Sequence, residues 1–100
     1  MEIRKEATAG TLESSDVLVR IAPNPENEIE IRLESVVKTT FGQKIEATVR
    51  EVLREMGVTG AIVELTDKGA IDCVIRARVE AAVCRASETK FNWEGESVHG

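Results

Sequence analysis

The chain has few of the side chains that usually build an aromatic core or carry acid–base chemistry. Aromatic residues make up 3% of its 100 residues, with two Phe, one Trp and no Tyr. The hydrophobic core must therefore be built from Val, Ile, Leu and Ala. There is one histidine, His99. A serine nucleophile needs an adjacent base, and the sequence offers none near its serines, so we do not expect a stand-alone hydrolase.

Cysteine is also scarce, and the two that are present are not expected to pair. Cys73 and Cys84 lie eleven residues apart in a segment with helical periodicity, which separates them by ~16 Å along the helix axis. A disulfide needs Cα atoms within ~7 Å of each other. No nearby histidine supplements the two thiols as metal ligands. We therefore predict two free thiols and a reducing compartment, the cytoplasm.

Long hydrophobic runs and an excess of positive charge are both missing. The first twenty residues contain no continuous apolar stretch of the kind found in secretory signals, and no run is long enough to span a membrane. The chain has 13 Lys and Arg against 18 Asp and Glu, a net charge of -5. This balance argues against a nucleic-acid partner. It serves solubility, and it would also suit a partner with a basic docking surface.

Alternating apolar and polar residues predict two strands, over residues 17–22 and 28–34. Glu28, Glu30 and Glu34 lie on one face of the second strand, which we expect to be solvated. The connection between the strands contains two prolines, which cannot donate to a sheet ladder. Because it is short, we predict that the two strands pair as an antiparallel hairpin.

Helical spacing follows this hairpin. A long helix is predicted from Ser35, as its N-cap, to Gly57 at its C-terminal end. A third strand is expected over residues 60–65. Thr66 or Asp67 would then cap a second helix over residues 70–87. The predicted inward residues of the first helix are Val37, Phe41, Ile45, Val49, Val52, Leu53 and Met56, and those of the second are Ile71, Val74, Ile75, Arg78, Val79 and Ala82.

The predicted class is therefore α+β, with a small sheet of three to four strands that begins with the β-hairpin and is covered by two helices, in the order β-β-α-β-α. One domain spans residues 1–100. Residues 1–16 are expected to form an extended arm, with a short edge strand at residues 7–12. Residues 88–100 are expected to be a loose tail, which Phe91 and Trp93 would attach to the body.

The segment Gly10-Thr11-Leu12-Glu13-Ser14-Ser15-Asp16 is the most informative part of the chain. It places two hydroxyls between carboxylates in a polar break before a strand. A serine that is displayed without a base is better suited as an attachment point than as a nucleophile. Glu13 and Asp16 would then give a modifying enzyme a charge pattern to recognise. The alternative is an ordinary loop with local backbone hydrogen bonds, and the pattern alone does not separate Ser14 from Ser15.

Three segments carry a resemblance to a known family. They are Ala9-Gly10-Thr11-Leu12-Glu13-Ser14, Asp16-Val17-Leu18-Val19-Arg20-Ile21-Ala22-Pro23, and Asp67-Lys68-Gly69-Ala70-Ile71-Asp72-Cys73, which continues through Val74-Ile75-Arg76-Ala77-Arg78-Val79-Glu80-Ala81. On these segments the chain resembles the acyl carrier protein of citrate lyase, its small gamma subunit, from about Ala7 to Ser87.

The resemblance implies that Ser14, the first serine after Leu-Glu, carries the prosthetic group. Ser15 falls where the family varies and often has glycine, so the role is not extended to it. The implied group is 2′-(5″-phosphoribosyl)-3′-dephospho-coenzyme A, which is joined to the serine oxygen by a phosphodiester and holds an acetyl thioester on its terminal thiol. The expected cofactor is therefore covalent, and no metal is expected.

The resemblance also implies partners and a reaction. The alpha subunit would exchange acetyl for citryl, and the beta subunit would split the citryl thioester into oxaloacetate and the acetyl thioester, while the small subunit catalyses neither step. Further implied partners are a holo-carrier synthase, which is a phosphoribosyl-dephospho-CoA transferase, and an acetyl-transferring ligase. The carrier of a related citramalate-type lyase and an unmodified protein-binding module remain alternatives.

Overall fold

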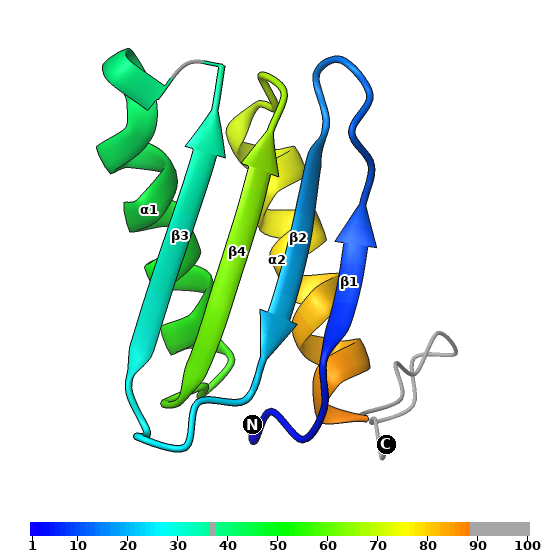
Figure 1. Cartoon of the computed structure of the whole chain (residues 1–100), viewed down its shortest axis with the longest axis vertical. Helices are drawn as coiled ribbons and strands as arrows, with labels where there is room; N and C mark the ends of the chain where they lie inside the picture. The colour runs from blue at the N-terminus through cyan, green and yellow to red at the C-terminus, as the bar shows by residue number, and fades with distance from the viewer. Residues whose placement is uncertain (37, 89–100) are drawn as a thin grey trace.

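Four strands form one sheet, and two helices cover one of its faces (Figure 1). The computed structural model describes residues 1–36 and 38–88. Its elements are β1 (Ala7–Gly10), β2 (Val17–Ala22), β3 (Ile29–Ser35), α1 (Lys38–Glu55), β4 (Ala61–Asp67) and α2 (Asp72–Ser87). The predicted α+β class is confirmed, with β1 as an additional first strand. The predicted tail, with Phe91 and Trp93, lies outside the described residues apart from Glu88.

The predicted pairing of residues 17–22 with residues 28–34 is wrong, because β4 lies between these two strands. The sheet order is β1-β2-β4-β3. Val63 in the middle of β4 lies opposite Ile21 of antiparallel β2 on one side and opposite Ile31 of parallel β3 on the other. The first hairpin is formed instead by β1 and β2, where Ala9 lies opposite Val19. The predicted edge strand is therefore present as β1.

The connection from β2 to β3 passes the start of β4 instead of folding back on itself (Figure 1). The Thr59 hydroxyl donates to Asn27 Oδ1 at 2.9 Å, and the Ala61 N–H donates to the Glu28 carbonyl at 3.1 Å. These bonds fix the connection against the beginning of β4. Helix α1 then provides the crossover that two neighbouring parallel strands require.

The core is aliphatic, as the composition predicts. The sheet residues that face the helices include Val17, Val19, Ile21, Ala61, Val63 and Leu65, each 1% exposed or less. Helix α1 adds Ile45, Val49, Val52 and Leu53, and α2 adds Ile75, Val79, Ala82, Val83 and Ala86. Full burial of each Val, Leu or Ile side chain contributes about 1.5–3 kcal/mol. Within the described residues, Val, Ile, Leu and Ala therefore build this core.

Among the described residues, two that were predicted to face inward are exposed, while Val37, also predicted to face inward, lies outside the described residues. Phe41 is 50% exposed and Ile71 is 66% exposed. Both line an open cleft of about 310 Å³ between the first turn of α1 and the start of α2, above the buried Ile45 and Ile75. Residues at the rim of this cleft keep contact with solvent, although they have the helical spacing of the inward residues.

The predicted start signals for both helices are wrong. Ser35 is the last residue of β3, and α1 begins at Lys38. Thr66 and Asp67 are the last residues of β4, and no side-chain hydrogen bond caps the N-terminus of α2. In each case the preceding strand extends further than predicted. The polar residues therefore belong to the strand and do not lie at the N-terminus of the helix. The glycine that follows α1, Gly57, has a φ of +72°, as predicted for a C-terminal residue.

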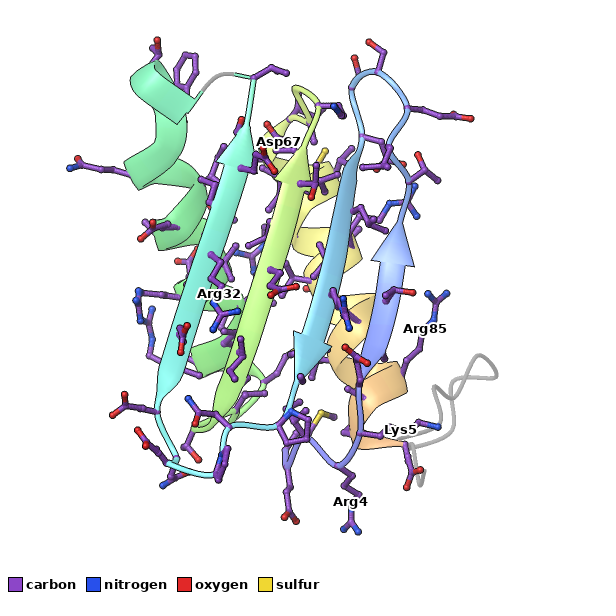
Figure 2. All side chains as sticks on the ribbon, viewed as in Figure 1. Arg4, Lys5, Arg32, Asp67 and Arg85 are labelled. Carbon is purple, nitrogen blue, oxygen red and sulfur yellow. The ribbon has the colours of Figure 1, made fainter. Side chains whose placement is uncertain are left out.

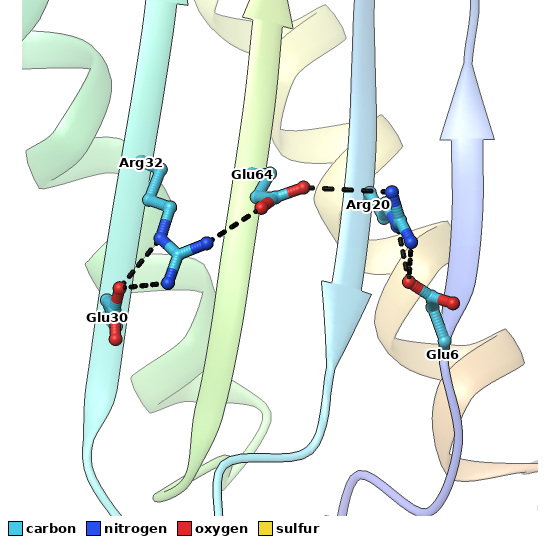
Figure 3. Close-up of polar contacts among 5 residues, drawn as sticks. All are labelled: Glu6, Arg20, Glu30, Arg32 and Glu64. Carbon is cyan, nitrogen blue, oxygen red and sulfur yellow. Dashed lines mark hydrogen bonds and ion pairs between the residues drawn. The ribbon is translucent and has the colours of Figure 1, made fainter.

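The face of the sheet without helices, called the open face below, carries a row of charges across the strands (Figure 3). Arg32 bonds to Glu30 at 2.7 Å and to Glu64 at 3.0 Å, and Arg20 pairs with Glu64 at 4.0 Å and with Glu6. Figure 2 shows Arg32 among the other polar side chains of this face. The expected solvation of the glutamates of residues 28–34 is confirmed, since Glu28, Glu30 and Glu34 are exposed.

Candidate functional site

The β1–β2 loop, residues 11–16, lies at the end of the sheet where β4 also ends (Figure 1). The Glu13 N–H donates to Thr11 Oγ1 at 3.1 Å, and the Asp16 N–H donates to the Glu13 carbonyl at 3.1 Å. The second bond closes a turn over residues 13–16 in which Ser14 and Ser15 are the central residues. Ser15 has a φ of +68°, the left-handed conformation that a type II turn requires at its third position.

The Asp16 side chain fixes this loop through hydrogen bonds. Its carboxylate accepts two hydrogen bonds from the Arg78 guanidinium, at 3.0 and 2.8 Å, one from the Thr11 hydroxyl at 2.7 Å and one from the Val17 N–H at 2.7 Å. These bonds, with that of Arg78 the strongest, hold the pKa of the Asp16 carboxyl well below its usual range, against the opposing effect of burial. The pKa of Arg78 is raised by the same pair. Asp16 therefore remains an ionised, fully engaged carboxylate.

Gly10 allows the loop to leave β1. Its φ is +93°, and a Cβ atom added there would lie 1.9 Å from the Val17 carbonyl oxygen and 3.3 Å from Cδ of Arg78. A side chain at this position would therefore collide with the first residue of β2 and press on the arginine that holds Asp16. Glycine is required here both for its backbone conformation and for the close approach.

The turn between β4 and α2 supports the loop from the other side. The Ser15 N–H donates to the Lys68 carbonyl, and the Lys68 N–H donates to the Asp16 carbonyl, both at 2.9 Å. Asp67, 1% exposed, fixes this turn, because its carboxylate accepts hydrogen bonds from the Gly69 and Ala70 N–H groups at 3.1 and 3.0 Å.

The Asp67 carboxylate also ties this turn to β3. It accepts a hydrogen bond from the Ser35 hydroxyl at 2.7 Å. Figure 2 shows Asp67 at the end of β4. Asp67 thus joins the end of β3 to the turn that supports the β1–β2 loop.

The structure separates the predicted site residues into two groups. Glu13, Ser14 and Ser15 are exposed, whereas Asp16 is only 9% exposed. Within the described residues, no hydrogen-bond partner of the Ser14 hydroxyl is found. Sequence reasoning placed Arg78 on the inward face of α2 but assigned it no role in the site. The sequence did contain a signal for this role. Arg78 is a cation among the apolar inward positions of α2, and a cation at such a position needs an anion nearby.

The groups around Ser14 decide what the loop can do chemically. Among the described residues, no base is hydrogen-bonded to the Ser14 hydroxyl. Asp16 lies in the same turn, and its lowered pKa and four hydrogen bonds make it a poor base. Both thiols are free, as predicted, with Cys73 exposed and Cys84 half-buried. Within residues 1–36 and 38–88, no three His, Cys, Asp or Glu side chains are grouped to hold a metal ion.

None of the helices in the described part of the chain is long and apolar enough to cross a membrane. A small α+β domain that displays a serine on a fixed loop, with no base hydrogen-bonded to it among the described residues, has the features expected of a carrier domain. Comparison with known proteins identifies the kind of carrier. The family model described as malonate decarboxylase delta subunit (MdcD) matches residues 4–86.

Curated relatives cover almost the whole chain. The citrate lyase acyl carrier protein of Clostridium perfringens is 54% identical over 94 residues, which are 93% of each chain. That of Escherichia fergusonii is 57% identical, over 93% of this chain and 97% of its own. The chain therefore belongs to the family of the citrate lyase acyl carrier proteins.

A solved structure has the same fold. It is the crystal structure of a Pseudomonas malonate decarboxylase hetero-tetramer in complex with malonate, which matches with a TM-score of 0.69. The match covers 84% of this chain and 86% of the other, at 18% sequence identity. At this identity the similarity concerns the fold alone.

Proposed function

We propose that this chain is the non-catalytic acyl carrier subunit of a citrate lyase, and that its prosthetic group is attached to Ser14 Oγ. The proposed group is 2′-(5″-phosphoribosyl)-3′-dephospho-coenzyme A, joined through a phosphodiester. When bound, this group supplies a terminal thiol that holds an acyl group as a thioester. The proposed partners are the alpha and beta subunits of the lyase, the holo-carrier synthase and an acetyl-transferring ligase.

The observation that carries this proposal is the contrast between Ser14 and the residues around it. The Ser14 side chain is exposed at the corner of a turn, while the neighbouring Asp16 is buried and held by four hydrogen bonds. An exposed hydroxyl on a fixed turn gives a modifying enzyme one well-defined position to approach. A bulky group attached there meets solvent instead of the core, so the residues present fit the proposed group.

The chain's own residues then act by holding the attachment point. Arg78 and Thr11 fix the Asp16 carboxylate, and Asp16 in turn fixes the end of the loop through the Val17 N–H. Because Asp16 is fully engaged, the proton of the Ser14 hydroxyl must be accepted by a base of the modifying enzyme. A covalently tethered group reaches two active sites at high effective concentration without dissociating, which is the advantage of a rigid carrier domain.

The first experiment measures intact mass. The chain is expressed with its modifying enzymes, and the unchanged protein should gain the mass of one phosphoribosyl-dephospho-coenzyme A. Ser14→Ala should abolish the gain, and the matched variant Ser15→Ala should keep it. If Ser15→Ala loses the group and Ser14→Ala keeps it, the assignment to Ser14 is wrong.

A second experiment tests the role in the complex. Ser14→Ala should still co-elute with the alpha and beta subunits in size-exclusion chromatography, but citrate cleavage by the reconstituted complex should be lost. Full cleavage by the Ser14→Ala complex would instead identify the chain as an unmodified assembly module. A reconstituted complex that cleaves citramalate but not citrate would assign the chain to a citramalate-type lyase.

A further inference from the structure

Lys68 lies beside the proposed attachment point and has no role in the site described so far. Its backbone carbonyl accepts from the N–H of Ser15, and its own N–H donates to the carbonyl of Asp16, both at 2.9 Å. Lys68 is therefore paired directly with the residues that follow Ser14. It lies in the turn between the end of β4 and the start of α2.

The position of Lys68 is fixed by the buried residue before it. Asp67 bonds to the N–H groups of Gly69 and Ala70 on the far side of Lys68 and to the Ser35 hydroxyl of β3. The backbone of Lys68 is thus held on both sides, while its side chain is half-buried on a flexible four-carbon stem. A fixed backbone beside a movable cation is suited to meeting an anion that is added to the loop.

The charges near the loop leave Lys68 available for this role. Arg78 is committed to the Asp16 carboxylate through two hydrogen bonds. Among the described residues, Lys68 makes no ion pair, and neither does the exposed Glu13 on the turn. Lys68 is joined to this loop by backbone hydrogen bonds. Among the described residues, no carboxylate neutralises the charge of its ammonium group.

We propose that Lys68 is a positioning residue whose ammonium group pairs with the phosphodiester on Ser14. This inference rests on the proposed attachment at Ser14. A phosphodiester carries one negative charge at neutral pH, and a lysine ammonium offers it three hydrogen-bond donors. The pair would direct the base of the tethered group toward the β4–α2 turn and restrict the directions in which the tether leaves the domain.

The test compares lysine acetylation in the modified and unmodified chain, with a small N-hydroxysuccinimide ester as reagent and peptide mass spectrometry as readout. Lys68 should react about fivefold more slowly in the modified chain, the factor expected for unit charges in contact in water. The matched control is Lys5, which is exposed at the opposite end of the sheet from Asp67 (Figure 2) and should react at the same rate in both forms. In ~1 M salt, where charges are screened beyond about 3 Å, the protection of Lys68 should largely disappear.

Two results would overturn the inference. Equal Lys68 reactivity in both forms contradicts it, and protection that persists unchanged in high salt indicates steric cover by the tether instead of an ion pair. A second measurement is the phosphorus-31 NMR line of the diester, which should move in Lys68→Ala, stay in Lys5→Ala and return toward its original position in Lys68→Arg.

The same experiments separate this inference from the proposed function. If intact mass finds no adduct on the chain, the attachment at Ser14 is wrong and the role of Lys68 is wrong with it. If the adduct is present on Ser14 and neither the Lys68 reactivity nor the phosphorus line responds, the attachment stands and only the role of Lys68 is wrong.

Discussion

Two groups of carboxylate–guanidinium pairs in this molecule, one beneath the β1–β2 loop and one on the open face, have different roles. Beneath the β1–β2 loop, the Asp16 side chain is 13% exposed and binds Arg78, whose side chain is 40% exposed, and the Asp16 oxygens also bind the backbone. On the open face, both partners of every pair are 42–57% exposed. Exposed pairs are screened by water and salt and contribute little to stability. The Asp16 carboxylate, held by Arg78, instead positions a segment of main chain through its bond to the Val17 N–H.

The largest effect is expected from a change that breaks the loop at its entry. Gly10→Ala introduces a Cβ 1.9 Å from the Val17 carbonyl oxygen, and should lower the free energy of unfolding by about 3 kcal/mol or more. The measurement is urea unfolding. Gly69→Ala is the matched control, since Gly69 also has a positive φ, +92°, but has no atom within 4 Å of an added Cβ. Equal losses would mean that the collision at Gly10 is unimportant.

The next effect concerns the turn that supports the loop. Asp67→Ala removes the acceptor for two backbone N–H groups and the Ser35 hydroxyl. Buried donors left without a partner should cost about 3 kcal/mol in total, measured by urea unfolding. Thr66→Ala, one residue earlier on the open face, should change stability far less. A loss at Thr66 as large as that at Asp67 would contradict this account.

The part-buried pair of Asp16 and Arg78 predicts that the stability of the chain depends on pH. The folded-state pKa of Asp16 lies below its ordinary value of 3.8, so its contribution to stability is present above that value and is lost as pH falls toward the lowered pKa. Asp16→Asn should therefore be less stable than the unchanged chain at neutral pH. The difference should shrink progressively below about pH 5, as followed by thermal unfolding. A difference that stays constant down to about pH 2 would exclude the ionised pair as its cause.

A smaller effect is expected on the turn itself. Ser15 holds a φ of +68°, which glycine adopts without strain. Ser15→Gly should therefore be neutral or stabilise the chain by about 0.5 kcal/mol, and should leave attachment at Ser14 intact by mass. Ser14→Gly is the control and should not be stabilising, because Ser14 has no positive φ.

The smallest effect is expected on the open face. Glu64 is the central acceptor of the charge row, bound by Arg32 and Arg20. Glu64→Gln should leave urea unfolding almost unchanged, because both pairs are exposed to solvent. A loss comparable to that of Asp16→Asn would mean that the two regions do not differ in the way described.

The sequence patterns identified the strands and helices better than their arrangement. Alternation located residues 17–22 and 28–34 correctly, because each strand has one face in the core. It carried no information on which strands are neighbours, and a short connection was taken as evidence for a hairpin. The competing signal was the strand–helix–strand order around α1, which favours parallel neighbours β3 and β4. In the folded sheet β4 pairs with both β2 and β3, and it therefore lies between the two strands that were predicted to form a hairpin.

The candidate site was predictable in part. The residue pattern around Ser14 indicated an exposed attachment point, and the structure places Ser14 on an exposed turn. The pattern gave no reason to expect Asp16 to be buried, because its partner Arg78 lies 62 residues further along the chain. The position of Lys68 beside this loop could not be predicted for the same reason, because its partners Ser15 and Asp16 are far from it in the sequence. Local sequence does not reveal bonds between loops that only the completed sheet brings together.

The central place of β4 has a consequence for how the protein is made. Among the strands of the described residues, β4, which joins the two halves of the sheet, is also the last to be synthesised, so a nascent chain that ends before residue 61 has the edges of β2 and β3 without their partner. Unpaired strand edges invite aggregation. Stable folding should therefore begin only after β4 has left the ribosome, and truncated chains that end before it should be degraded or insoluble.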